Sequence, residues 1–573
     1  MLAVKAVVAL VVAAAAVTTN VQAERIGVNC TLTSNDLIDS LLNAPKCNQN
    51  HICRFDEDKQ VCELDVSAVV TMQDGSHNKT QQPLLDPKDW FLTTEEITKS
   101  RDGHERNGLQ TFTDGNDVRA FASSDEYFLS AMHDIERTGR GKTKDRIYMV
   151  GWGIADVPFA PLDSSTNSSL THLIGGAVGR GVDVNALFWA NPNPSEFARA
   201  DPLRDWMNSL ATPKGTTAKF IFDDRLAYPH SSHHQKILVI QAGNDLVAYV
   251  GGVDVTVDRW DTRGHDQKDL RKKAGIADEF NGWVDAHLRL HGPAAFDVAA
   301  NVEQRWNSAD QTGRSFVANL TEFKNAEYDD VTPIDRKAVT ELPKNGTQHV
   351  QARLKAIANA KNYIYIEDQY FINVPELQKA LLEVLPRIQR LIIVIQRMTK
   401  GTDLAGYGRY QLDMIAPLQQ RFPNKVQLYS TKESRNVYIH SKVLVIDDVF
   451  LSVGSSNWNK RSMTSDSEIG ANIIDSHHVL TRDDIKVAKL AHHFRVQKFQ
   501  EHTGLPFHTL AKMPFIEAAN ALDNAAHKND TVIEHLLLKN KAYFDIYDND
   551  TQDLVDPDDR CGSETLLSAL MED

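Results

Sequence analysis

Short, nearly unbroken runs of hydrophobic residues recur between about residues 86 and 515, and they form two matching series. The first series contains five runs of strand length, at 147–152, 182–189, 219–222, 237–240 and 246–250. The second series contains five more, at 363–366, 391–395, 426–429, 443–446 and 450–453. Continuous runs of this kind are typical of strands in a sheet that is covered on both faces.

An amphipathic, helix-like segment precedes each series, at 124–137 and at 350–360. One long unit used twice predicts two related lobes and not a solenoid of short repeats. We therefore predict an α/β fold of two pseudo-symmetric α/β/α lobes, each with a mixed β-sheet flanked by helices, and an active site at the lobe interface. The lobes are expected at 86–330 and 331–515, followed by an acidic C-terminal appendage at 516–573 with one helical pattern near 530–540.

The first 23 residues have the pattern of a secretory signal peptide. Lys5 is followed by an apolar run from 6 to 17 and by a small-residue cleavage site that ends at Ala23. The alternative is an uncleaved anchor, although 12 apolar residues are few for a membrane span. The pattern predicts a secreted, extracellular protein.

Sequons and cysteines agree with secretion. Seven N-x-[ST] sequons predict a glycoprotein, and they lie at Asn29, Asn78, Asn167, Asn319, Asn345, Asn529 and Asn549. Residues 24–85 are expected to form a Cys-rich segment and linker, with four cysteines at Cys30, Cys47, Cys53 and Cys62. So short a segment cannot bury its own core, so two disulfides are expected, with three pairings open and Cys561 left free or bridged to them. A zinc site is the alternative, but the spacing lacks the paired C-x-x-C form.

The composition is that of a globular protein, with 42% hydrophobic and 24% charged residues. Acidic residues (77) outnumber Lys and Arg (62), which gives a formal net charge of -15. A chain this acidic is a poor electrostatic match for a duplex phosphate backbone, although one locally basic pocket can still receive a single phosphate. We expect no nucleic-acid partner, no transmembrane segment in the mature chain, and a monomer.

The same small group of reactive residues stands between a strand and a glycine turn in each half. The first half has HHQKILVIQ with His234 and Lys236, and the second has IHSKVLVID with His440, Lys442 and Asp447. Residues i and i+2 of a strand share a face, so each His–Lys pair points to one side. Two halves related by a pseudo-twofold axis would place two imidazoles and two ammonium groups around one cavity.

Those side chains suit phosphoryl transfer from a phosphodiester. One imidazole can attack phosphorus, the other can protonate the leaving oxygen, and Lys236 and Lys442 can hold the non-bridging oxygens. Ser455 and Asn457, in the second glycine turn, add neutral donors for the phosphate. This chemistry needs neither a metal nor another cofactor. The alternative, ordinary surface His–Lys pairs, does not explain two copies at matching positions.

The doubled H-x-K-x4-D pattern resembles the phospholipase D superfamily. Further segments resemble its phospholipid-cleaving branch, namely GGVDVTVDRWD (251–261), GWVDAHLRLHGPAAFDV (282–298), QRWN (304–307), YIEDQYF (365–371) and NWNKRSMTSDSEIG (457–470). The resemblance covers about residues 86 to 515. It implies a secreted phospholipase D that hydrolyses phosphatidylcholine-type lipids at a membrane surface to phosphatidic acid and free head group, through a phosphohistidine. Transfer to another alcohol is also implied.

The resemblance also implies roles for single residues. His234 is expected as the nucleophile and His440 as the general acid, although the pseudosymmetry leaves the reverse open. The family places an orienting carboxylate about 27 residues after each histidine. Asp261 lies 27 residues after His234 and Glu468 lies 28 after His440, with Asp466 as a near alternative.

The first motif departs from the family pattern at its last position. Gln241 stands where the second motif has Asp447, and a longer turn with Asp245 as a candidate replacement follows it. Glutamine can still form hydrogen bonds, and an acid beyond the strand end is expected to support structure, so we expect activity to survive. Asp254 stands where symmetry would place a counterpart of Asn457.

Two other functions remain open from the sequence. A secreted nuclease or other phosphodiesterase of the same superfamily would use the same chemistry, and a catalytically impaired lipid-binding protein would explain Gln241.

His230 and His233 would form a metal site only if a third ligand converged on them. Three tryptophans could line a lipid channel but are more typical of buried domain seams: Trp260, Trp283 and Trp306. His287 is expected to brace the lobe interface.

Overall fold

The computed structural model describes residues 79–538, with gaps at 101–102, 104–110, 142–144, 192, 224–225, 227–230, 309–326, 328, 335–346 and 399–405. It also describes Asp556 and the backbone of two short N-terminal strands, β1 (Cys53–Asp56) and β2 (Val61–Leu64). The expected signal peptide and the side chains of all five cysteines lie outside the described residues, so the secretion signal and the disulfides stay predictions.

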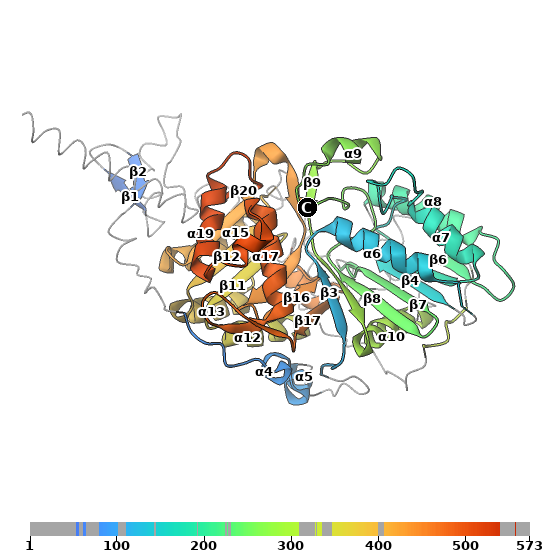
Figure 1. Cartoon of the computed structure of the whole chain (residues 1–573), viewed down its shortest axis with the longest axis horizontal. Coiled ribbons are helices and arrows are strands. Elements are labelled where there is room, and N and C mark those ends of the chain that lie inside the picture. Colours follow the sequence, from blue (N-terminus) through green and yellow to red (C-terminus); the bar gives the residue numbers. More distant parts are fainter. Residues whose placement is uncertain are drawn as a thin grey trace, which may run out of the picture.

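The first lobe is built on a seven-stranded mixed sheet with the spatial order β3-β10-β8-β7-β4-β5-β6. Its strands are β3 (Asp117–Phe121), β4 (Arg146–Gly151), β5 (Asp183–Trp189), β6 (Ala218–Asp223), β7 (Ile237–Ala242), β8 (Asp245–Gly251) and β10 (His287–His291). β4, β5 and β6 are parallel to one another, and the other neighbours pair antiparallel. The flanking helices are α6 (Ser124–Arg137), α7 (Leu170–Gly179), α8 (Pro194–Asn208) and α10 (Pro293–Asn307) (Figure 1).

The second lobe repeats this plan in the order β17-β16-β15-β11-β12-β13-β20. Its strands are β11 (Tyr363–Asp368), β12 (Arg390–Ile395), β13 (Val426–Thr431), β15 (Lys442–Ile446), β16 (Phe450–Gly454), β17 (Gly470–Ile474) and β20 (Ile533–His535). Its longer helices are α12 (Thr347–Asn359), α13 (Pro375–Val384), α15 (Tyr407–Arg421), α17 (Lys489–Thr503) and α19 (Phe515–Ala526). All ten predicted strand segments are confirmed to within two residues at each end, and so is the two-lobed α/β fold.

Short elements complete the described chain. The helical ones are α4 (Pro87–Trp90), α5 (Thr94–Ser100), α9 (Lys268–Lys273), η2 (Leu385–Arg387), η3 (Glu433–Arg435), α16 (Lys460–Thr464) and α18 (Phe507–Leu510). The strands are β9 (Gly282–Val284), β14 (Val437–Ile439), β18 (His478–Leu480) and β19 (Lys486–Ala488). Within the described parts of the chain, no helix is both long enough and apolar enough to cross a bilayer.

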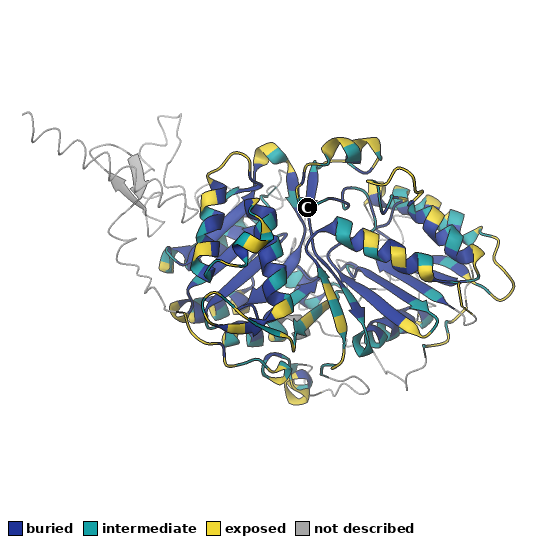
Figure 2. Cartoon of the chain, in the orientation of Figure 1, coloured by how far each residue is buried: buried dark blue, intermediate teal, exposed yellow. Residues whose placement is uncertain are grey.

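The central strands carry apolar residues on both faces because both faces are covered. In β4, Ile147 and Met149 join the core beneath α6 and α7, whereas Tyr148 and Val150 join a core that both lobes share. All apolar residues of β12 are fully buried. Figure 2 shows the strands of both lobes as a buried interior beneath partly exposed helices. The shared core fixes the two sheets relative to each other, and with them the two histidine motifs.

Two expected domain boundaries need correction. Residues 79–100 belong with the second lobe, because Trp90 stacks on Phe450 with ring centroids 5.5 Å apart and α4 and α5 contact α12. The C-terminal boundary expected at 515 also lies too early. α19 packs against α17, and β20 pairs with β13 at the sheet edge, where a helix was predicted. An edge strand of three residues is too short to show a period in the sequence.

Candidate active site

Backbone hydrogen bonds fasten each histidine motif to the opposite lobe. The His234 N–H donates to the Ser467 carbonyl (2.9 Å), and the Ser467 N–H donates to the Ser232 carbonyl (2.9 Å). The His440 N–H donates to the Val284 carbonyl (2.8 Å), directly after the parallel pairing of β14 with β9. These crossings place both imidazoles at the lobe interface, as the sequence predicted.

Each histidine is oriented by a carboxylate from the other lobe. His234 Nδ1 lies 3.0 Å from both carboxylate oxygens of Glu468, and His440 Nδ1 lies 2.8 Å from Asp285 Oδ2. The expectation that Glu468 serves His440 within its own repeat is therefore corrected. The physical reason is the backbone bonding between the lobes. The residue before each acid, Ser467 or Val284, accepts the backbone N–H of the histidine in the other lobe and so brings its neighbouring acid to that ring.

Asp261 does not serve His234, contrary to the expectation from its spacing. It accepts hydrogen bonds from the Trp283 N–H (2.8 Å) and lies 2.6 Å from His265 Nδ1, inside the lobe interface. The true counterpart of Glu468 is Asp285, which sequence reasoning missed. Gly252 bonds the carbonyl after Asp285 just as Ser455 bonds the carbonyl after Glu468.

The signal that could have identified Asp285 was the repeat itself. An inserted stretch that contains α9 separates the first glycine turn from its acid, so Asp285 follows His234 by 51 residues and not by 28. Counting from the histidine failed because of this insertion. Asp466, the near alternative, accepts a hydrogen bond from the Ser232 N–H (2.7 Å) and pairs with Arg461. It supports the backbone before His234.

The two lysines lie buried beside the histidines with different partners. Lys236 Nζ donates to the His234 carbonyl (2.8 Å) and lies 3.3 Å from Asp254 Oδ2. Lys442 Nζ donates to the His440 carbonyl and to Gln369 Oε1 (3.1 Å). The first lysine thus faces a carboxylate, whereas the second faces a neutral amide.

One cavity of about 540 Å³ brings together three of the nine predicted site residues, among them both histidines. It is lined by His234, His440, Asp254 and Asn457 together with aromatic and acidic residues. Ser455 is fully buried and points elsewhere: its hydroxyl donates to Glu468 Oε2 (2.5 Å) and accepts from the Ile469 N–H (2.9 Å). The prediction that Ser455 binds phosphate is corrected, because its hydroxyl is committed to the orienting carboxylate.

An aromatic group around His440 was underestimated from the sequence. Trp283 lines the cavity and stacks on Tyr438, with centroids 4.8 Å apart, and lies 5.1 Å from the His440 ring. The guanidinium of Arg259 lies 4.0 Å from the Trp283 ring centroid. Trp260 and Trp306 are buried outside the lining, as expected of tryptophans in the interior. His287, also buried, lies in β10 and accepts from the Val253 N–H (3.3 Å).

The two halves of the site differ electrostatically. Burial, followed by the charges of Lys442, Arg259 and Lys236, lowers the pKa of His440 well below its ordinary value. Burial also lowers the pKa of Lys442 to about 8. Burial alone would raise the pKa of Glu468, but His234 and Lys236 outweigh it and hold that pKa below its ordinary value. In contrast, burial raises the pKa of Asp285.

Asp447, the acid of the second motif, lies past the end of β15 and away from the cavity. Its carboxylate accepts the backbone N–H groups of Lys361, Asn362 and Tyr363 and the side chain of Gln82. This agrees with a supporting role and corrects its inclusion among the catalytic residues.

In the first lobe the same role falls to Asp145, which the sequence did not suggest. Its carboxylate accepts the N–H groups of Gly139 and Gly243, each at 2.8 Å. Asp245, the candidate replacement, instead forms an exposed ion pair with Arg137. The turn after β7 therefore keeps a carboxylate partner although Gln241 replaces the motif acid, because Asp145, directly before β4, accepts the N–H of Gly243 in that turn.

Within the described residues, one group could supply three metal ligands: Glu367, Glu501 and His502. The ammonium of Lys498 already lies 2.8 Å from Glu367 and contacts Glu501, and all of these side chains are fully buried. A lysine cation thus fills the place that a metal would take. His233 contacts Asp223 (3.3 Å), and His230 lies outside the described residues.

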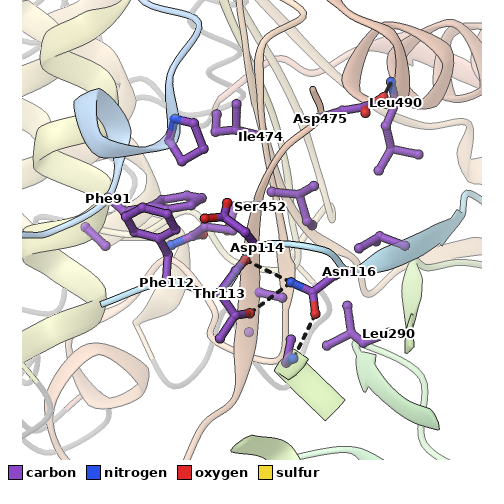
Figure 3. Close-up of a pocket in the computed structure, with 18 of the residues that line it drawn as sticks. Phe91, Phe112, Thr113, Asp114, Asn116, Leu290, Ser452, Ile474, Asp475 and Leu490 are labelled. Carbon is purple, nitrogen blue, oxygen red and sulfur yellow. Dashed lines mark hydrogen bonds between the residues drawn. The ribbon is translucent and has the colours of Figure 1, made fainter. Parts of the chain in front are cut away.

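A larger groove of about 1510 Å³, whose lining includes neither His234 nor His440, is shown in Figure 3. The close-up shows Phe91, Phe112 and Asp114 from the segment before β3, with Ile474 above them and Leu490, also from the second lobe, at the upper right of the view. Of the described catalytic candidates, its lining includes only Glu468. The smaller cavity is therefore the candidate active site.

Comparisons with known proteins match both lobes. Residues 141–339 match the family model described as Phospholipase D, and residues 354–494 match Cardiolipin synthase, PLD-like domain. Phospholipase D A of Dictyostelium discoideum is 23% identical over 474 residues, which cover 68% of this chain and 36% of that protein. Phospholipase D alpha 1 of Nicotiana tabacum is 23% identical, over 67% of this chain and 65% of that protein.

These matches span between about a third and two thirds of the relatives' own length. Among solved structures, phosphatidylserine synthase from Haemophilus influenzae Rd KW20 aligns with a TM-score of 0.44 at 14% identity. That alignment covers 77% of this chain and 94% of the synthase.

Proposed function

Because this chain belongs to the phospholipase D superfamily, we propose that it hydrolyses phosphatidylcholine-type phospholipids to phosphatidic acid and a free head group. One observation carries the proposal: His234 and His440 line a single cavity, and each is bonded through Nδ1 to a buried carboxylate of the opposite lobe. That bond directs the Nε2 atom of each ring away from the carboxylate and toward a substrate.

In the first step, His234 Nε2 attacks phosphorus and the bond from phosphorus to the head-group oxygen breaks. His440 gives its Nε2 proton to that oxygen, so the alcohol leaves neutral. Lys236 and Lys442 stabilise the charge on the non-bridging oxygens. Glu468 stabilises the positive charge that forms on the His234 ring when it is phosphorylated, because its carboxylate contacts Nδ1.

In the second step, His440 removes a proton from water, and the water oxygen attacks phosphorus. The bond from phosphorus to His234 breaks and phosphatidic acid is released. An alcohol in place of water gives a transfer product by the same route. The cations around His440 favour its neutral form in the empty site. A bound phosphate anion offsets these charges and raises the proton affinity of the His440 ring, so substrate binding favours the protonated form that acts as the general acid.

The lining of the cavity supports a cationic head group such as choline. Aromatic faces attract quaternary ammonium groups, and Trp283, Tyr438 and Phe280 lie together at the cavity wall. Six acidic side chains line the same cavity: Glu196, Asp254, Asp258, Asp278, Glu279 and Asp466.

The first experiment measures choline release from phosphatidylcholine vesicles, with ethanol added and with EDTA in a parallel reaction. We expect choline, phosphatidic acid and phosphatidylethanol, and equal rates with EDTA. Mass spectrometry of a quenched reaction should find the phosphoryl group on His234. A phosphoryl group on His440 would reverse the two roles, and no product from any phospholipid would overturn the proposal.

Secretion is a separate proposal, supported by the leader pattern and by two sequons at exposed positions, Asn167 and Asn529. When the chain is expressed in a secreting eukaryotic cell, the protein should be found in the culture medium, and its mass should fall after glycosidase treatment. The variants N167Q and N529Q should each remove part of that shift. Protein retained in the cell and insensitive to glycosidase would argue against secretion.

A further inference from the structure

Pseudosymmetry pairs a charged residue of the cavity with a neutral one. The Gly252 N–H donates to the Ala286 carbonyl (2.9 Å), and the Ser455 N–H donates to the Ile469 carbonyl (2.8 Å), so the two glycine turns are equivalent. Asp254 comes two residues after the first donor, and Asn457 comes two residues after the second. Both line the catalytic cavity and both are more than nine-tenths buried.

The charge of Asp254 is fixed inside that cavity. Its Oδ2 atom lies 3.3 Å from Lys236 Nζ, and its Oδ1 atom accepts the Trp152 N–H (3.3 Å). Burial alone would raise its pKa, but Lys236 and Arg259 outweigh burial and hold the pKa below its ordinary value. A buried carboxylate thus stands where the equivalent half-site has an amide, next to a lysine that we assign to the phosphate.

We propose that Asp254 is a specificity-determining residue that selects phosphate diesters over phosphate monoesters by charge. The proposal rests on the proposed function of the same site and deepens it. A diester carries one negative charge, whereas a monoester carries nearly two above its second pKa of about 6. Repulsion by a fixed carboxylate acts on each charge, so its free-energy cost is about twice as large for the monoester.

This selection fits the chemistry of the reaction. The substrate is a diester and the product, phosphatidic acid, is a monoester. A carboxylate that disfavours the second charge therefore promotes release of the product and reduces inhibition by free phosphate monoesters. Asn457 at the equivalent position adds no charge there, so the diester monoanion can still bind between Lys236 and Lys442.

A purely structural role predicts the opposite result. If Asp254 served only to hold Lys236 in place, its replacement by asparagine would weaken the binding of every phosphate ligand. Charge selection predicts that the same replacement strengthens binding, and strengthens it more for the monoester. The two explanations therefore differ in the sign of one measurement.

The experiment compares D254N with the wild-type protein by calorimetry, using ethyl phosphate as the monoester and diethyl phosphate as the diester. At pH 7.5 we expect D254N to bind diethyl phosphate roughly tenfold more tightly and ethyl phosphate roughly a hundredfold more tightly. At pH 5, where ethyl phosphate is mostly a monoanion, the two gains should become equal. Equal gains at pH 7.5, or weaker binding of either ligand, would overturn the proposal.

The mirror variant N457D provides an independent arm. It adds a carboxylate at the equivalent position, so it should weaken ethyl phosphate more than diethyl phosphate at pH 7.5 and equally at pH 5. A uniform loss at both pH values would count against charge selection even if D254N did not fold. These binding measurements need no turnover. If the protein released no choline, the proposed function would be refuted, but the comparison of ethyl phosphate with diethyl phosphate would still be valid.

Discussion

The two lobes hold their histidines by equivalent backbone bonds but surround them with different charges. His234 is the more exposed ring, at 13% of its side chain against 7% for His440, and it contacts the ionised Glu468. His440 lies against Trp283, near three cationic side chains, and contacts Asp285. The backbone has thus kept its symmetry while the charges have diverged, which suits one ring to nucleophilic attack and the other to proton transfer.

The turns after the two histidine strands differ in a second way. In the second lobe, Asp447 lies in the turn and accepts a backbone N–H from the start of the neighbouring strand. In the first lobe, Asp145 lies at the start of the neighbouring strand and accepts a backbone N–H from the turn. One structural task is therefore met from two sequence positions. A motif acid can be replaced when its role is to join the turn to the neighbouring strand and an acid on that strand forms the link from the other side.

The largest expected effect distinguishes the two histidines. H234A and H440A should each lower choline release by about 10⁴-fold or more. With a p-nitrophenyl phosphodiester, whose leaving group needs no proton, H440A should still release one equivalent of nitrophenol and H234A should not. The control is H477A, which changes an exposed histidine. Wild-type turnover in both alanine variants would refute catalysis at this site.

The next effect tests which carboxylates orient the histidines. D285N and E468Q should each lower kcat by about 10²- to 10⁴-fold, because the amide no longer stabilises a charged imidazole. D261N should leave kcat within about tenfold of wild type, since Asp261 contacts His265 and not a catalytic histidine. If D261N lost as much activity as D285N, the orienting role would belong to Asp261 after all.

A smaller effect concerns pH. Burial lowers the pKa of Lys442 from 10.5 to about 8, and only the protonated lysine attracts phosphate. The value of kcat/KM should therefore fall as pH rises above about 8, approaching tenfold per pH unit. K442R should move this decline to higher pH, because arginine stays protonated there. An unchanged alkaline limb in K442R would assign the decline to another group.

The smallest effect on activity is expected at the turns. D145A and D447A should each lower the free energy of unfolding by about 1–3 kcal/mol, because D447A leaves buried N–H donors unsatisfied and D145A leaves partly buried ones unsatisfied. Choline release by the folded fraction should change less than about threefold. Urea unfolding measures the first quantity. Q241D should not fully restore the stability of D145A, since Asp145 accepts the N–H groups of both Gly139 and Gly243, whereas the Gln241 side chain contacts Gly243. A full rescue would contradict the assignment of the turn to Asp145.

Much of the fold followed from local patterns. Ten of the fourteen strands in the two sheets were predicted because they are covered on both faces, so their apolar residues run together, as in β12. The strands β3, β10 and β17 were missed because polar residues interrupt their apolar positions. The short edge strand β20 was missed because three residues show no period. The two His–Lys pairs were found because their spacing places both side chains of a pair on one face of a strand, whatever the surroundings.

The sequence by itself determined the repeat, the two lobes and the two His–Lys pairs proposed to act on phosphate, because each depends on spacing along one strand or one helix. Only the tertiary structure decided which acid serves which histidine, because Asp285 and Glu468 reach their partners across the lobe interface. It also decided that Ser455 binds a carboxylate and that Asp145 replaces a motif acid. Contacts between residues far apart in the chain depend on how the two sheets pack, and an inserted stretch changes the count of residues without changing that packing.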